Sequence, residues 1–122
     1  MTKKLLIIDD DELVLLSLEE LFLARRYEVA AVPNGQEALK RAREERFDLV
    51  VTDVIMPGIS GFEVTKSLRA MPDYAKIPIV ILTAKSGEDD RAHGMEAGAS
   101  HFLPKPINPG ELLTLVESIF GQ

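Results

Sequence analysis

The feature that most constrains this chain is a regular alternation of short apolar runs with longer stretches of helical period. The predicted strands are Lys4 to Asp9, Tyr27 to Val32, Leu49 to Asp53, Ile77 to Thr83 and Ser100 to Leu103. The predicted helices are Asp11 to Arg25, Gly35 to Glu45, Ser60 to Ala70, Glu88 to Ala97 and Pro109 to Phe120. Strands and helices in this order are typical of a doubly wound α/β domain, with one parallel sheet covered by helices on both faces.

Length and composition exclude several classes of protein. The 122 residues predict a single domain, 1–122, and a net charge of −6 argues against charge-driven binding to nucleic acid or anionic lipid. The absence of cysteine excludes disulfides, Cys-ligated zinc and thiol nucleophiles. The apolar runs are too short for a signal segment or a membrane span, which predicts a soluble, cytoplasmic protein.

Chemically active side chains gather at the ends of the predicted strands, where ligands bind in open α/β sheets. Asp9 and Asp10 follow the first strand, Asp53 ends the third, Thr83 ends the fourth and Lys105 follows the fifth. A single charge there can mean only that the strand has reached solvent. Three carboxylates without His or Cys indicate a hard cation such as Mg²⁺, and an ammonium with a hydroxyl suits a phosphate group.

The same set of residues indicates phosphoryl chemistry, because an aspartate beside Mg²⁺ can act as a nucleophile toward phosphorus. The chain has neither of the glycine-rich loops that bind nucleotide phosphates or dinucleotides. His93 and His101 stand in no metal-ligand spacing and are interpreted as surface or half-buried residues.

Four short motifs, which extend over essentially the whole chain, together resemble the receiver domain of two-component response regulators. They are Asp9-Asp10, Asp53 within Thr-Asp-Val-Ile-Met-Pro-Gly-Ile-Ser-Gly, Thr83-Ala84 and Lys105-Pro106. Their order and spacing make the set highly specific, although each motif alone is weak. In size the chain is similar to the stand-alone chemotaxis type. The resemblance implies a five-stranded sheet of flavodoxin-like order 2-1-3-4-5.

The resemblance also implies a role in phosphorelay signalling. Asp53 would accept a phosphoryl group from a phosphohistidine on a sensor histidine kinase or histidine phosphotransfer protein. Asp10, Asp53 and the backbone carbonyl of Ile55 would ligate Mg²⁺, and Asp9 would hold metal-bound water. Such a protein is not a conventional enzyme, although it catalyses its own phosphorylation and dephosphorylation.

A conformational switch is a further implication of the resemblance. Thr83 and Lys105 would bind the phosphoryl oxygens, and Phe102 would turn inward when Thr83 moves. The alternative for Phe102 is plain core packing, because an aromatic side chain in a strand is common. The switched surface, which a downstream protein would bind, would be the fourth helix, the fifth strand and the fifth helix.

Some positions depart from the common pattern of the family. Ile55 and Lys85 occupy places that vary in the family and tune the lifetime of the phosphoryl group. Arg26 stands where a glycine often ends the first helix. Pro104 lacks a backbone donor, which an edge strand tolerates. The bond between Lys105 and Pro106 is expected to be cis.

Three other functions fit the same architecture. A pseudo-receiver would bind partners without phosphorylation, but such modules tend to lose an acidic or the lysine position, and none is lost here. An aspartyl phosphatase would carry a second acid at residue 55, where this chain has Ile55. A flavodoxin-like electron carrier would carry a phosphate loop after the first strand, where three aspartates would repel phosphate.

Two helices carry hypotheses that the family does not supply. In the first helix, Leu16 and Leu23 fall opposite the predicted buried face and would contact a partner or a second copy, although scattered surface leucines are normal. The fourth helix is expected to be weakly held, with Met95 as its only large anchor and Gly94 in its interior. Replacing Gly94 by alanine is expected to stiffen it, provided that Gly94 has helical backbone angles. The sequence names neither the cognate kinase nor the output.

Overall fold

The computed structural model describes residues 2–83 and 88–121. Its five strands are all parallel and lie in the order β2-β1-β3-β4-β5. The strands are β1 (Lys4–Ile8), β2 (Glu28–Val32), β3 (Leu49–Asp53), β4 (Ile79–Thr83) and β5 (His101–Pro104). The predicted fold class and strand order are therefore confirmed. β5 lies at an edge of the sheet, which accommodates Pro104 as expected.

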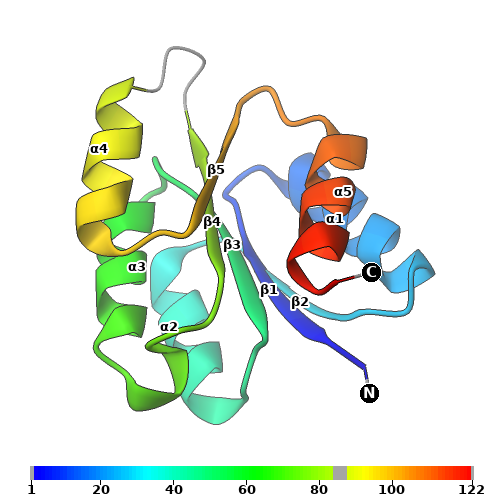
Figure 1. Cartoon of the computed structure of the whole chain (residues 1–122), viewed down its shortest axis with the longest axis horizontal. Coiled ribbons are helices and arrows are strands. Elements are labelled where there is room, and N and C mark those ends of the chain that lie inside the picture. Colours follow the sequence, from blue (N-terminus) through cyan, green and yellow to red (C-terminus); the bar gives the residue numbers. More distant parts are fainter. Residues whose placement is uncertain (1, 84–87, 122) are drawn as a thin grey trace.

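Helices cover both faces of the sheet, as Figure 1 shows. They are α1 (Glu12–Ala24), α2 (Gly35–Glu44), α3 (Gly61–Arg69), α4 (Glu88–Ala97) and α5 (Pro109–Ile119). In Figure 1, α1 and α5 lie on one side of the strands, and α2, α3 and α4 lie on the other. A short 3₁₀ helix, Pro72–Tyr74, was not predicted, because one turn carries too little periodicity to be seen in sequence.

The core consists of two apolar layers, one on each face of the sheet. Leu5 and Ile7 of β1 belong to the layer under α1 and α5, whereas Leu6 and Ile8 belong to the opposite layer. Side chains alternate between the faces of a strand, so a strand covered on both sides must be apolar throughout. This is why the central strands read as unbroken apolar runs.

Side chains that precede four of the helices cap them and start them at defined residues. Asp11, Asn34 and Asn108 accept hydrogen bonds from backbone N–H groups of the first turn of α1, α2 and α5. Ser60 and Glu63 form a reciprocal capping box at the start of α3. Asp11 and Ser60, which were predicted to be helical, are therefore caps. β4 starts at Ile79, two residues later than predicted.

Most of the expectations for α1 are confirmed. Leu16 and Leu23 are exposed, and Leu18 and Phe22 are buried against the sheet. Val14 and Leu21, which were expected on the same buried face, are half-buried, and Leu15 is buried although it was not expected there. Within the described ranges, no helix is both long and apolar enough to cross a bilayer.

The predicted anchor of α4 is wrong. The side chain of Met95 is 68% exposed, and the buried residues of the helix are Gly94 and Ala97. A large apolar residue on a helix is buried only if it lies on the face that packs against the rest of the molecule. In α4 that face carries Gly94 and Ala97, and Met95 lies on another face.

Candidate functional site

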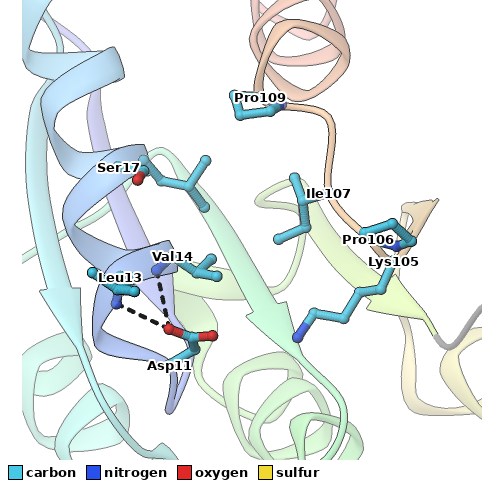
Figure 2. Close-up of a pocket in the computed structure, with 9 residues that line it drawn as sticks. Asp11, Leu13, Val14, Ser17, Lys105, Pro106, Ile107 and Pro109 are labelled. Carbon is cyan, nitrogen blue, oxygen red and sulfur yellow. Dashed lines mark hydrogen bonds between the residues drawn. The ribbon is translucent and has the colours of Figure 1, made fainter.

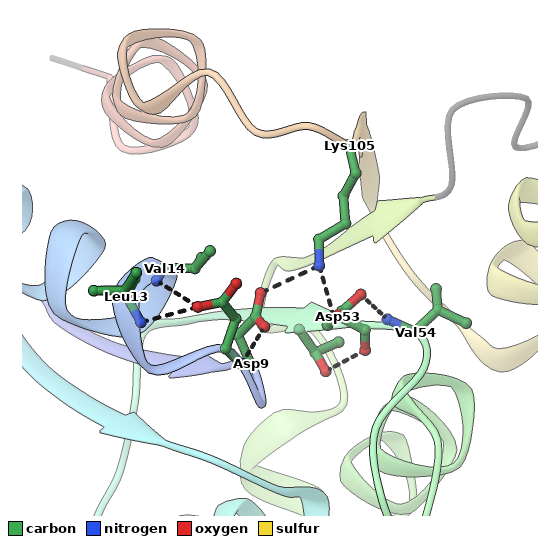
Figure 3. A network of polar contacts seen from close by, with 8 residues as sticks. Asp9, Leu13, Val14, Asp53, Val54 and Lys105 are labelled. Carbon is green, nitrogen blue, oxygen red and sulfur yellow. Dashed lines mark hydrogen bonds and ion pairs between the residues drawn. The ribbon is translucent and has the colours of Figure 1, made fainter.

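The site lies at the carboxyl ends of β1 and β3, which are neighbours in the sheet. Carboxylate oxygens of Asp9, Asp10 and Asp53 all lie within 4.8 Å of one another. Lys105, from the loop after β5, extends its ammonium to the same place (Figure 3). The structure thus brings together four of the predicted site residues, and they come from three segments of the chain.

Asp53 ends β3, and only 6% of its surface is exposed. Its Oδ1 accepts a hydrogen bond from the backbone N–H of Val54 at 2.8 Å. Its Oδ2 accepts a hydrogen bond from Nζ of Lys105 at 2.7 Å. The carboxylate is therefore fixed in orientation by the backbone N–H of the next residue on one side and by a cation on the other.

Asp9 is the most deeply buried acid of the site, with no exposed surface. Its Oδ1 accepts a hydrogen bond from the backbone N–H of Asp11 at 2.9 Å. Its Oδ2 has no hydrogen-bond partner among the described residues and lies 3.5 Å from Nζ of Lys105. Burial raises the pKa of Asp9, and the negative charge of Asp53 raises it further. The N–H of Asp11 and the ammonium of Lys105 lower the pKa, but they do not outweigh burial.

Lys105 is the only described cation paired with these carboxylates. Burial alone would lower its pKa, but the hydrogen bond and the charge of Asp53, together with Asp9, outweigh burial and raise the pKa. The ammonium is therefore charged at neutral pH. One positive charge faces three carboxylates, and this local excess of negative charge favours the binding of a further cation.

The predicted switch residues lie on β4 and β5. Thr83 is buried at the end of β4, where its hydroxyl donates a hydrogen bond to the carbonyl of Leu103 at 3.4 Å. Phe102 is half-buried on β5. Ile55 follows β3, and its side chain is 79% exposed. A metal-binding role for its carbonyl stays a prediction. Ala84 and Lys85 lie outside the described residues.

Other residues noted in the sequence take structural positions. The bond between Lys105 and Pro106 is cis, as expected. His93 is exposed, with its ring centroid 5.6 Å from that of Phe62, and His101 is half-buried on β5. Neither histidine belongs to the acidic cluster.

A groove next to the site was missed in the sequence. It has a volume of about 460 Å³ and lies between α1 and the loop after β5 (Figure 2). Its lining is Asp11, Leu13, Val14, Ser17, Leu18, Lys105, Pro106, Ile107 and Pro109. Leu13 is 75% exposed. The sequence offered one signal of this groove, which is that Leu13 lies three residues before Leu16, on the same side of the helix. Only the fold brings the loop after β5 opposite Leu13.

Comparison with known proteins agrees with this geometry. The family model of the response regulator receiver domain matches residues 5–117. The chain is 40% identical over 122 residues to the alkaline phosphatase synthesis transcriptional regulatory protein PhoP of Bacillus subtilis, covering all of this chain and 50% of PhoP. Across three such relatives it spans 57%, 50% and 26% of their lengths.

Solved structures show the same fold. The chemotaxis response regulator CheY4 of Vibrio cholerae is 33% identical, with a TM-score of 0.92 over 98% of this chain and 99% of CheY4. The receiver domain of a sensor histidine kinase from Pseudomonas aeruginosa, solved with a magnesium ion in its active site cleft, is 26% identical, with a TM-score of 0.88 over both whole chains. With a family model that matches nearly its whole length and a relative 40% identical over all of it, this chain belongs to the response regulator receiver domain family.

Proposed function

We propose that the chain accepts a phosphoryl group on Asp53 in a Mg²⁺-dependent reaction. The observation that carries this proposal is the arrangement of the Asp53 carboxylate, 2.7 Å from the ammonium of Lys105 and close to the buried Oδ2 of Asp9, which has no hydrogen-bond donor among the described residues. An oxygen of Asp53 forms a bond to phosphorus as the P–N bond of a phosphohistidine breaks, and the electron pair returns to the imidazole. Lys105 neutralises charge on the phosphoryl oxygens during the transfer.

The residues present fit a magnesium ion. Mg²⁺ prefers carboxylate and carbonyl oxygens and keeps several waters, and the cluster offers oxygens from Asp9, Asp10 and Asp53. The buried Oδ2 of Asp9 has no hydrogen-bond donor among the described residues, which supports a site completed by a cation or its water. Asp10, Asp53 and the carbonyl of Ile55 would hold the ion directly. When bound, Mg²⁺ supplies positive charge to the transferring oxygens.

The proposal extends to the partners of the chain. The donor is a sensor histidine kinase or a histidine phosphotransfer protein, and the switch runs from Thr83 through Phe102 to α4, β5 and α5, where a downstream protein binds. We place this relay in the cytoplasm and treat 1–122 as one receiver domain. The pseudo-receiver alternative finds no support, because Asp9, Asp53 and Lys105 are all present and in contact.

Mass spectrometry after incubation with acetyl phosphate and Mg²⁺ tests the proposed function. We expect one phosphoryl group per wild-type chain and none on Asp53→Asn. Asp10→Ala should bind Mg²⁺ more weakly and be labelled more slowly. Asp73→Asn removes an exposed carboxylate of the 3₁₀ helix and should behave as wild type. Labelling of a residue other than Asp53 in the wild type, or unchanged Mg²⁺ affinity in Asp10→Ala, would refute the respective assignment.

A further inference from the structure

The ring of Phe102 occupies the space that a side chain at position 94 would need. Gly94 lies in α4 and is buried. A Cβ atom built there would lie 2.5 Å from Cε1 and 3.2 Å from Cζ of Phe102. Carbon atoms do not approach so closely, so only a glycine at this position allows the ring its observed place. The missing side chain leaves a notch in α4 that the ring fills.

Two further contacts bound the same place. The guanidinium of Arg91, three residues before Gly94 in α4, lies 5.3 Å from the centroid of the Phe102 ring. A cation over an aromatic face is attracted by the quadrupole of the ring. The Cβ built at Gly94 would also lie 3.3 Å from Cδ1 of Ile81, the residue of β4 that pairs with Phe102. The notch at Gly94 thus faces side chains of both β4 and β5, and Arg91 of α4 lies over the ring.

α4 has few other buried contacts with the rest of the molecule. Its buried residues are Gly94 and Ala97, and Met95 is exposed. Its carboxyl end is tied to α3 by Nε of Arg69, which donates a hydrogen bond to the carbonyl of Gly98 at 2.8 Å. Removal of the ring from the notch would therefore take away the contact between Gly94 and Phe102, while the carboxyl end of α4 stays tied and α3 stays beside it.

We propose that Gly94 is a positioning residue, whose notch seats the ring of Phe102 and so couples the position of α4 to that of the ring. This inference rests on the proposed function, in which phosphorylation of Asp53 draws the ring inward and out of the notch. A methyl group at position 94 penalises the seated arrangement alone. The linkage is reciprocal, so a variant that disfavours the seated ring must bind the phosphoryl group or its mimic more tightly.

Gly94→Ala has two opposing effects. From the helix alone, alanine stiffens α4 and reduces the difference between the two states. With the ring in the notch, the same methyl group displaces Phe102 and shifts the resting protein toward the switched state. The two effects can be separated by making Gly94→Ala in a Phe102→Leu protein. A leucine side chain does not reach as far as the outer ring atoms, so only the stiffening of α4 remains there.

The experiment uses beryllofluoride with Mg²⁺ as the phosphoryl mimic and fluorophenylalanine as the spectroscopic probe. The chain has five phenylalanines, and the resonance of Phe102 is the one lost in Phe102→Leu. In Gly94→Ala without ligand, we expect this resonance to move toward its position in the beryllofluoride-bound wild type. We expect the affinity for beryllofluoride to rise by about fivefold to tenfold. Met95→Ala, on the exposed face of α4, should leave both unchanged.

The outcomes separate this inference from the proposed function. An unchanged resonance and affinity in Gly94→Ala, or an equal gain of affinity in the Phe102→Leu background, overturns the role of the notch. If Gly94→Ala does not fold, Gly94→Ala with Phe102→Leu should fold again, and failure of that rescue also overturns it. A wild type that binds no beryllofluoride refutes the proposed function instead, and the notch is then judged by the resonance alone.

Discussion

The buried carboxylate of Asp9 should lower the stability of the protein at neutral pH. Its pKa is raised in the folded state, mainly by burial. The folded protein therefore holds this proton more tightly than the unfolded chain does. Stability contributed by the proton is present below the ordinary pKa of an aspartate and is lost as the pH rises through the raised value.

We therefore expect Asp9→Asn to raise the free energy of unfolding at pH 7 by about 1 kcal/mol, because asparagine removes a buried charge and can still accept the N–H of Asp11. Urea unfolding between pH 4 and 8 measures this difference, which should shrink toward the acidic end. Added Mg²⁺ should stabilise the wild type more than the variant. Lower stability of Asp9→Asn at pH 7 would contradict this account, and Asp73→Asn serves as the control.

Arg26 has a backbone conformation that favours glycine. Its φ of 69° is left-handed and follows the end of α1, as its place in the sequence suggested. The left-handed region destabilises a residue with a Cβ by about 1–2 kcal/mol, and glycine avoids this strain. Glycine also makes the unfolded chain more flexible, which lowers the free energy of unfolding and cancels part of the gain. We expect Arg26→Gly to raise the free energy of unfolding by about 0.5–1 kcal/mol. Arg25→Gly, at a φ of −100°, should lower it in the same denaturation experiment.

At the scale of elements, α1 presents leucines to solvent next to the groove. Leu13, Leu16 and Leu23 are between 51% and 75% exposed. The spacings of three and seven residues place them on one side of the helix. Leu13 also lines the groove beside the site, and Lys105, which pairs with the acidic residues, lines the same groove. Glu20 is also exposed on this side, between Leu16 and Leu23. Exposed leucines that begin beside the site suit a docking partner, either the histidine-containing donor or a second copy of the chain.

We expect Leu16→Glu combined with Leu23→Glu to slow phosphotransfer from a histidine-containing donor, or to abolish self-association in sedimentation if a second copy covers the strip. Labelling by acetyl phosphate should not change, because so small a donor needs no docked surface. Lys66→Glu on α3 is exposed and changes the net charge equally, so it controls for charge. If donor transfer and self-association both match the wild type, the strip is ordinary surface.

At the scale of the whole molecule, stability should fall from the central strands toward α4. The residues of β3 and β4 are all buried, whereas the buried residues of α4 are a glycine and an alanine. Local opening is easiest where few apolar contacts are lost. Hydrogen exchange should show the amides of α4 exchanging faster than those of β3, and changing when beryllofluoride and Mg²⁺ are added. Protection of α4 equal to that of β3, and unaltered by the ligand, would refute the switch.

The sequence predicted much of the site because the chemistry follows from topology. Asp9, Asp53 and Lys105 follow or end parallel strands, and parallel strands bring their carboxyl ends to one edge. Their convergence could be predicted without coordinates. A phosphate contact for the hydroxyl of Thr83 followed from its place at a strand end, whereas its switch role and the role of the Ile55 carbonyl came from the family resemblance. All of these roles stay predictions.

The packing of α4 could not be predicted, because it depends on a contact between residues distant in sequence. Met95 was the only large apolar residue of the helix, and composition alone made it the anchor. The direction in which a helical face points depends on how the helix is set against the sheet. Here that direction buries Gly94 and exposes Met95.

The sequence by itself determined the order of the strands and helices, the parallel sheet and the acidic edge, because periodicity and strand ends are local properties of the chain. Only the tertiary structure decided which contacts those elements make. It buried an oxygen of Asp9 without a hydrogen-bond donor among the described residues, opened the groove beside α1, and seated the ring of Phe102 in the notch of Gly94. These features depend on side chains from separate segments that fill, or leave open, one volume. Close packing is a property of the assembled core, so no single stretch of sequence carries it.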